Sequence, residues 1–170
     1  GSYVILGVSS GWSDSKGMTD FIRLSGLLSE DERIVLVGKM PAKAEVPENI
    51  ISVGETSDVH ELAEYYAMAD LFLNLSIEES FGKVTAEALA CGTPAIVYET
   101  TACPELIGEN CGRIVKLHDV DEVYRQIRHM KQQDKSYYER ACRSYAKEHF
   151  HKDENIRRYM ELYREIEAKR

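Results

Sequence analysis

Short apolar runs alternate with amphipathic stretches along most of this chain, and that alternation constrains its fold more than any other feature. Runs of four to six residues rich in Val, Ile and Leu are typical of buried strands, and they lie at 3–8, 33–38, 50–54, 71–75, 95–98 and 112–115. Continuous apolar strands separated by helices indicate a parallel sheet covered on both faces. With right-handed crossovers, the pattern predicts a Rossmann-like open parallel sheet of about six strands.

Apolar residues at three- and four-residue spacing predict the helices. One is expected over 18–28, one after Asp58, one from about Gly82 to Cys91, and only helices after residue 118. Asp58 with Glu61 has the spacing of a capping box, and Ser136 with Glu139 opens a later helix in the same way. The last helix carries an apolar stripe that we expect to be partly exposed or in an intermolecular contact: Ile156, Tyr159, Met160, Tyr163 and Ile166.

Size and charge restrict the class of protein. The 170 residues suit a single domain, and Gly1-Ser2 resembles a cloning scar, which leaves 3–170 as the domain. The net charge of −8 argues against a nucleic-acid partner. No apolar run is long enough for an integral membrane segment and no signal peptide is visible. The four cysteines form no Cys-x-x-Cys pair and are interpreted as reduced thiols of a cytoplasmic protein.

Open parallel sheets bind ligands beyond the carboxyl ends of their strands. The loops that follow Val8, Gly38, Val53, Leu75 and Tyr98 are therefore the places for a site. No Gly-x-Gly-x-x-Gly, no P-loop motif and no Gly-x-Ser-x-Gly occurs, which argues against a dinucleotide-binding domain, a P-loop NTPase and an α/β-hydrolase.

The loop after the fourth strand carries acidic residues and then opens a helix at Gly82. A helix start binds anions because its first N–H groups have no partner. Glu79 precedes this helix and Glu87 lies inside it, so two carboxylates would flank a bound phosphate and accept hydrogen bonds from sugar or ribose hydroxyls. The alternative, which the spacing leaves open, is that Glu79 caps the helix and Glu87 is solvated.

The segment EESFGKVTAEALACGTPAIVYETTACPELIGENCGRIV closely resembles the donor-binding region of family 4 glycosyltransferases of the GT-B fold. Glu79 and Glu87 match the two ends of the family's E-x7-E motif. The resemblance extends weakly from Val4 to Val115 and covers only the C-terminal half of such an enzyme. It implies the donor-binding domain of a retaining hexosyltransferase, which moves a hexose from a nucleoside-diphosphate sugar to an acceptor hydroxyl in surface polysaccharide biosynthesis.

The resemblance also implies roles for individual residues. Glu79 would bind hydroxyls of the transferred sugar, and Lys16 would bind the diphosphate as the second catalytic group. Glu87 would hold the ribose. The other donor-binding residues implied are Phe81, Gly82 and Lys83 at the diphosphate, through backbone N–H groups, and Gly38, Val53, Gly54 and Thr56 along the nucleobase.

One position departs from the family's pattern. An Arg usually lies five or six residues before the Lys that matches Lys16, and here Ser10 and Gly11 stand there. A charge-assisted phosphate contact contributes about 1.5–3 kcal/mol. Either Lys83 or another basic residue supplies this charge, or donor binding is weakened.

The expected ligand is a UDP- or GDP-sugar, with no further cofactor and no metal. Asp119-Val120-Asp121 has the form of a metal-binding D-x-D motif, but its place before a helix favours a cap. The resemblance implies an N-terminal acceptor-binding domain of the same chain as partner, a fragment that is inactive alone, and a location at the inner face of the membrane. Two alternatives stay open: a non-catalytic nucleotide-sugar-binding module, and a GT-B-related sugar-nucleotide epimerase.

Overall fold

The computed structural model describes residues 1–42 and 44–168, and a parallel sheet runs through their centre in the order β3-β2-β1-β4-β5-β6. Every neighbouring pair of strands is parallel, so the predicted Rossmann-like open sheet is confirmed. The strands are β1 (Tyr3–Gly11), β2 (Glu32–Lys39), β3 (Ile50–Val53), β4 (Leu71–Asn74), β5 (Ala95–Tyr98) and β6 (Gly112–Val115).

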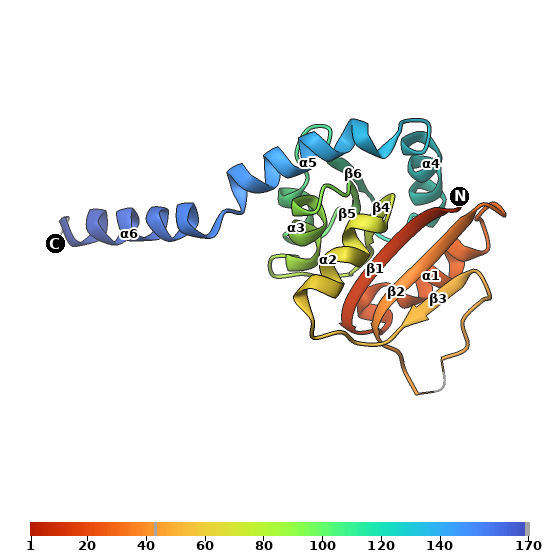
Figure 1. The fold of residues 1–170 in the computed structure, drawn as a ribbon. Coiled ribbons are helices and arrows are strands. Elements are labelled where there is room, and N and C mark those ends of the chain that lie inside the picture. Colours follow the sequence, from red (N-terminus) through yellow and green to blue (C-terminus); the bar gives the residue numbers. More distant parts are fainter. Residues whose placement is uncertain (43, 169–170) are drawn as a thin grey trace.

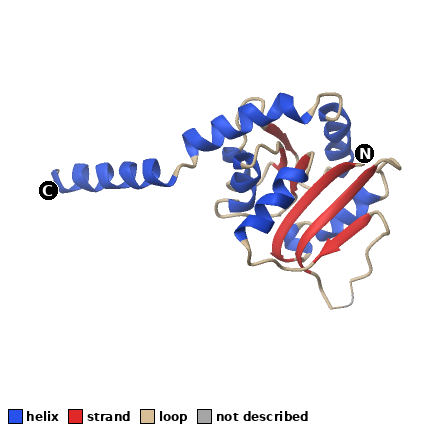
Figure 2. Ribbon diagram, viewed as in Figure 1, coloured by secondary structure: helices blue, strands red, loops and turns tan. Residues whose placement is uncertain are grey.

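Helices cover both faces of the sheet (Figures 1 and 2). The helices α1 and α4 contact each other on one face, and α2, α3 and α5 form a layer on the other. Two short 3-10 turns, η1 and η2, follow β1 and β5. The bounds are η1 (Asp14–Lys16), α1 (Met18–Ser25), α2 (Val59–Met68), α3 (Lys83–Ala90), η2 (Cys103–Leu106), α4 (Val120–Met130) and α5 (Lys135–His149).

The position of the hydrophobic core follows from the packing of helices on both faces of the sheet. All residues of β4 and β5 are buried, because these strands have neighbours on both sides and helices on both faces. The edge strand β3 has exposed residues at its centre, with Ile51 49% exposed. The largest fully buried side chains include Tyr66, Tyr98 and Phe21, which join the helices to the sheet.

The chain reverses direction within the sheet between β1 and β4. It builds β1, β2 and β3 outward on one side, then returns to place β4 against the other side of β1. In open α/β sheets this switch point opens a crevice at the carboxyl ends of the two strands. The turn after β1 and the loop after β4 meet there, because the Ile77 N–H donates to the Ser15 carbonyl at 2.9 Å.

Asp58 caps α2 as predicted, but the predicted capping box with Glu61 is wrong, and so is the predicted cap of α5. The Asp58 carboxylate does accept from the His60 N–H at 2.8 Å. In a capping box, Glu61 would accept from the backbone N–H of Asp58. That N–H instead donates to Thr56 Oγ1 at 3.1 Å, and Glu61 accepts from the Thr56 hydroxyl, so the capping box does not form. In α5 the cap is Asp134 rather than Ser136, since Asp134 accepts from the Ser136 N–H.

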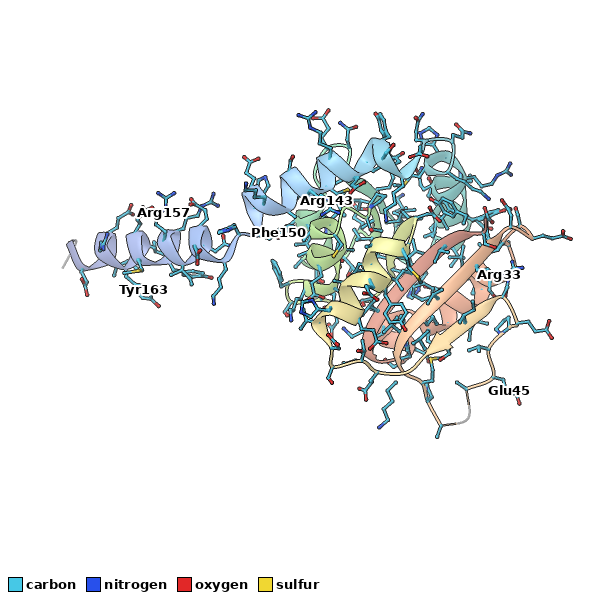
Figure 3. All side chains as sticks on the ribbon, in the orientation of Figure 1. Arg33, Glu45, Arg143, Phe150, Arg157 and Tyr163 are labelled. Carbon is cyan, nitrogen blue, oxygen red and sulfur yellow. The ribbon has the colours of Figure 1, made fainter. Side chains whose placement is uncertain are left out.

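The last helix, α6 (Lys152–Ala168), extends away from the rest of the domain (Figure 1). Its apolar stripe is more exposed than expected. All five members are between 47% and 67% exposed, and Tyr163, the most exposed of them, is labelled in Figure 3.

A substitution at Gly38, near the end of β2, tests whether β2 approaches β1 closely there. The φ of Gly38 is +128°, and a Cβ there would lie 1.8 Å from the carbonyl oxygen of Ser9. We expect Gly38→Ala to lower the free energy of unfolding by about 2–5 kcal/mol, from overpacking and backbone strain together. Gly11→Ala is the matched control, because a Cβ at Gly11 meets no atom within 4 Å. Urea titration followed by circular dichroism measures both, and equal effects would contradict this account.

The exposed stripe of α6 generates a second prediction. Fully burying each of these side chains is worth about 1.5–3 kcal/mol, which favours self-association after ordering costs. Removing residues 152–170 should therefore shift concentrated samples to a single monomeric species in sedimentation velocity. The free energy of unfolding should change by less than about 1 kcal/mol, since the stripe is exposed in the monomer. An unchanged distribution of masses, or a large loss of stability, would contradict the exposed arrangement.

Candidate functional site

Two hollows open at the carboxyl ends of the strands. The larger, of about 560 Å³, is lined by the ends of β1 and β2, the loop after β3, α2 and the first turns of α3. Its lining residues are Val8, Ser9, Ser10, Val37, Gly38, Glu55, Thr56, Ser57, Leu62, Lys83, Val84 and Glu87. The second, of about 420 Å³, is lined by η1 and the loops after β4 and β5: Lys16, Glu78, Glu79, Ser80 and Thr101.

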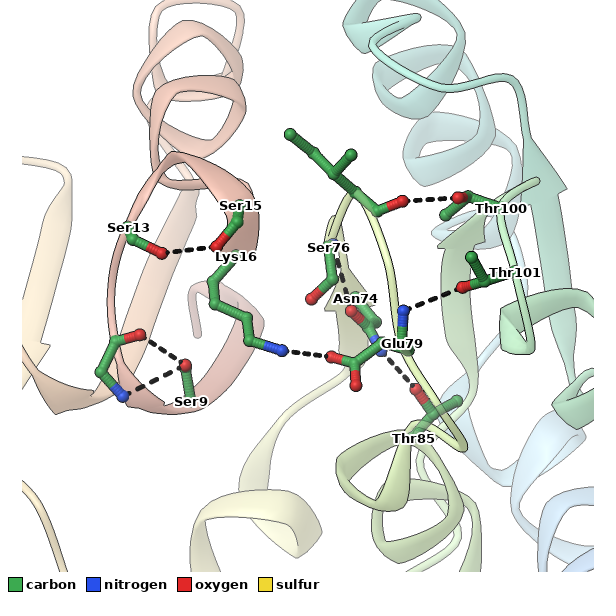
Figure 4. A network of polar contacts seen from close by, with 12 residues as sticks. Ser9, Ser13, Ser15, Lys16, Asn74, Ser76, Glu79, Thr85, Thr100 and Thr101 are labelled. Atoms are coloured by element: carbon green, nitrogen blue, oxygen red, sulfur yellow. Dashed lines mark hydrogen bonds and ion pairs between the residues drawn. The ribbon is translucent and has the colours of Figure 1, made fainter.

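An ion pair between Lys16 and Glu79 joins the two walls of the second hollow (Figure 4). Lys16 Nζ donates to Glu79 Oε1 at 2.8 Å, and the two side chains are 34% and 16% exposed. The backbone N–H of Glu79 donates to Thr101 Oγ1 at 2.8 Å. Glu79 is therefore fixed from both ends, and it does not cap α3.

The position of Lys16 depends on the glycine that follows it. Gly17 has a φ of +81°, and a Cβ there would lie 2.4 Å from the carbonyl oxygen of Leu75. A side chain at this position would push η1 away from the end of β4. The absence of a side chain at Gly17 thus brings Lys16 within reach of the loop that holds Glu79.

Asn74 fastens the end of β4 to α3. It is a buried polar residue, and its Nδ2 donates to Thr85 Oγ1 at 3.1 Å while its Oδ1 accepts from the Ser76 N–H at 3.2 Å (Figure 4). Sequence analysis missed this role. The available signal was a single amide in an otherwise apolar strand, which in a buried position requires partners.

The start of α3 leaves donors free for a ligand. Gly82 is the N-cap, with a φ of +80°, and no side chain caps the helix. The first backbone bond is the Thr85 N–H to the Gly82 carbonyl, at 2.9 Å. The N–H groups of Gly82, Lys83 and Val84 therefore have no partner within the helix, and together with the helix dipole they favour an anion. Phe81, just before, packs its half-exposed ring edge-on against Phe150.

The Glu87 carboxylate lies in the larger cavity with both oxygens engaged. Oε1 is 3.3 Å from Lys83 Nζ, and Oε2 accepts from the Tyr66 hydroxyl at 3.0 Å. Burial, and then the Glu87 carboxylate, raise the pKa of Tyr66, so the phenol stays protonated as a donor. Sequence analysis gave Tyr66 no role at the site, and no local pattern could have shown that its hydroxyl reaches α3.

The residues expected along a nucleobase separate into two groups. Gly38 and Thr56 line the larger cavity. Val53 and Gly54 are not among its lining residues: Val53 pairs with Val37 in the sheet, and the Gly54 carbonyl accepts from the Gly38 N–H at 3.3 Å. Other lining residues that sequence analysis did not identify as ligand contacts are Ser9, Glu55 and Ser57.

A buried carboxylate on α1 ties three elements together beside the crevice. Asp20, 3% exposed, accepts from the Tyr98 hydroxyl at 2.7 Å, and His118 Nδ1 lies 2.7 Å from the same oxygen. These contacts join α1 to β5 and to the loop before α4. Burial and the hydrogen bond to Asp20 raise the pKa of Tyr98, which keeps its proton on the phenol.

The D-x-D sequence serves as a helix cap. Asp119 accepts from the Glu122 N–H at 3.0 Å at the start of α4. Among the described residues, no three side chains of His, Cys, Asp or Glu gather in a way that could hold a metal ion. The same residues include no helix with the length and apolarity that a membrane crossing needs.

Comparison with known proteins agrees with this geometry. Residues 2–133 match the family described as glycosyl transferases group 1. A GDP-mannose-dependent alpha-(1-6)-phosphatidylinositol dimannoside mannosyltransferase of Mycobacterium tuberculosis is 37% identical over 87 residues, which cover 48% of this chain and 23% of that protein. The matched stretch thus spans about a quarter of the length of this relative.

Solved structures show the same fold. The Anabaena protein HepE in complex with UDP superposes with a TM-score of 0.79 at 17% identity, over 96% of this chain and 49% of that one. The C-terminal domain of a group 1 glycosyl transferase from Francisella tularensis superposes with a TM-score of 0.73 at 19% identity, over 88% and 87%. This chain belongs to the glycosyl transferases group 1 family, and its Rossmann-like sheet matches part of its GT-B neighbours.

Proposed function

We propose that this chain is the C-terminal, donor-binding domain of a retaining family 4 hexosyltransferase that uses a UDP- or GDP-sugar. The observation that carries the proposal is the grouping of Glu87, Lys83 and the free N–H groups of α3 at one cavity. A cavity of about 560 Å³ is within the range of about 300–1,000 Å³ of small-molecule sites. The Anabaena neighbour was solved with UDP, which supports a nucleotide in the equivalent position.

The nucleoside would occupy the larger cavity. Glu87 would accept hydrogen bonds from the ribose hydroxyls, with Tyr66 holding one carboxylate oxygen in place. Gly38 and Thr56 line the part of the cavity proposed for the nucleobase, with Val53 and Gly54 behind them.

The diphosphate and sugar would lie between α3 and η1. The N–H groups near Phe81, Gly82 and Lys83, together with Lys16, would stabilise the negative charge that develops on the leaving diphosphate. This requires no metal and no further cofactor. Glu79 would accept hydrogen bonds from the hexose hydroxyls, and its ion pair with Lys16 holds both groups beside the second hollow.

The acceptor site would belong to an N-terminal domain of the same protein. Its relative from Mycobacterium tuberculosis is about four times as long as the matched region, which leaves room for such a domain. The domain alone would bind donor nucleotide and catalyse no transfer. The acceptor we propose is a growing surface polysaccharide, reached from the cytoplasm at the inner face of the membrane.

One observation favours a second candidate, a non-catalytic nucleotide-sugar-binding module. Ser9 and Ser10 line the cavity from β1, and Gly11 follows, so this segment brings hydroxyls where the family pattern has an Arg. Sugar transfer by a chain that carries both domains would separate the enzyme from the binding module. Epimerisation of the donor by that chain would instead identify the GT-B-related epimerase.

Calorimetric titration with UDP, GDP and ADP tests the binding role. At least one should bind the wild-type domain, and Glu87→Gln should raise its Kd at least tenfold, because a hydrogen bond to a charged group contributes about 1.5–3 kcal/mol. Glu148→Gln, at an exposed position of α5, is the matched control and should leave the Kd unchanged. Equal affinity of wild type and Glu87→Gln would remove Glu87 from the site.

In a chain with both domains, Glu79→Gln should reduce turnover more than nucleotide binding.

A further inference from the structure

Acidic residues outnumber basic ones among the described residues that line the larger cavity. Among its described lining residues, Lys83 carries the single positive charge, whereas Glu55 and Glu87 are both acidic. A nucleoside diphosphate brings further negative charge into this space. Without a cation close to the phosphates, the carboxylates of the cavity would oppose its binding.

The end of β1, which lines the larger cavity, cannot supply that cation. Ser9 Oγ bonds to the backbone of Gly11 at 2.9 Å, and Gly11 has no side chain. Trp12 is turned into the core, where its indole N–H donates to the Val37 carbonyl at 3.2 Å and its ring packs edge-on against Phe21. Apart from Lys16, which lines the second hollow, a further cation for the phosphates must therefore come from another element.

Lys83 is placed and held in a way that suits this role. It is the first residue of α3, beside the unpartnered N–H groups, and its side chain is 83% exposed. Its contact with Glu87, whose side chain is 31% exposed, is an i,i+4 pair at 3.3 Å within one helix, a kind of ion pair that contributes little to stability. Lys16 differs, because it forms a shorter and less exposed pair with Glu79 at the second hollow.

We propose that the Lys83 ammonium leaves Glu87 and binds the diphosphate of the donor, and that it supplies the charge that Ser10 and Gly11 do not. This inference rests on the proposed function of the cavity. The exchange releases Glu87 Oε1 for a ribose hydroxyl, while Tyr66 keeps Oε2 in place. Phosphate binding and ribose binding are coupled by this exchange, since each requires the Lys83–Glu87 pair to open.

The test uses the nucleoside diphosphate among UDP, GDP and ADP that binds most tightly, and its nucleoside. Lys83→Met should raise the Kd of the diphosphate about 10- to 100-fold, as expected for a lost charge-assisted contact. In ligand-observed NMR, the nucleoside should bind equally well or more tightly. Lys83→Arg should retain diphosphate binding, and Lys147→Met, an exposed lysine of α5, should leave it unchanged.

A rescue variant makes the inference sharper. A Cβ at Gly11 meets no atom within 4 Å, so Gly11→Arg fits the backbone and places a cation at the end of β1. In the Lys83→Met background it should recover at least half of the lost binding free energy. An unchanged diphosphate Kd in Lys83→Met, or an equal loss for diphosphate and nucleoside, would overturn the inference. A wild-type domain that binds none of the three diphosphates would overturn the proposed function itself.

Discussion

The arrangement of the site depends on the contact between the turn after β1 and the end of β4. Gly17 lies against the Leu75 carbonyl, and the Ile77 N–H donates to Ser15. This contact holds the two edges of the crevice together at the switch point, where the strand order reverses. It brings residues from both sides of the sheet to the same crevice, including Lys16 from one side and Glu79 from the other.

The two lysine–glutamate pairs have different physical characters. The Lys16–Glu79 pair is short and partly buried, and its members come from elements 63 residues apart. It therefore depends on the tertiary fold and helps to hold the crevice in shape. The Lys83–Glu87 pair lies within one helix, with side chains 83% and 31% exposed, so it opens at less cost in free energy than a buried pair. The Lys16–Glu79 pair is therefore suited to holding a fixed geometry, and the Lys83–Glu87 pair to exchanging one partner for another.

Local patterns predicted the elements well because burial on both faces of a parallel sheet leaves a clear apolar signal. The runs that became β4 and β5 are buried throughout, and Gly82 marked the start of α3. Predicted cap partners failed where side chains had competing choices: Thr56, outside the expected motif, took the N–H that Glu61 was expected to bind. Both the motif and the competitor fit the sequence, and only the loop geometry selects between them.

The candidate site also has a part that the sequence predicted and a part that it could not. The spacing of Glu79 and Glu87 around a helix start pointed to a ligand crevice. The partners that orient them could not be predicted, because they come from other elements. Tyr66 reaches Glu87 from α2, and Thr101 reaches Glu79 from the loop after β5. Their side chains also serve in packing or turns, so their types alone give no indication of a role at the site.

The glycines at the crevice have a consequence for the history of such domains. Gly17 and Gly38 are required because the backbone at each of them packs closely against another backbone segment, at Leu75 and Ser9 respectively. These close contacts exist whether or not a ligand binds. A descendant that lost its ligand would still need both glycines to fold, while Lys83 and Glu87 would be free to drift. Retained glycines in a diverged copy would therefore indicate inheritance of the architecture, and retained Lys83 and Glu87 would indicate inheritance of the proposed donor site.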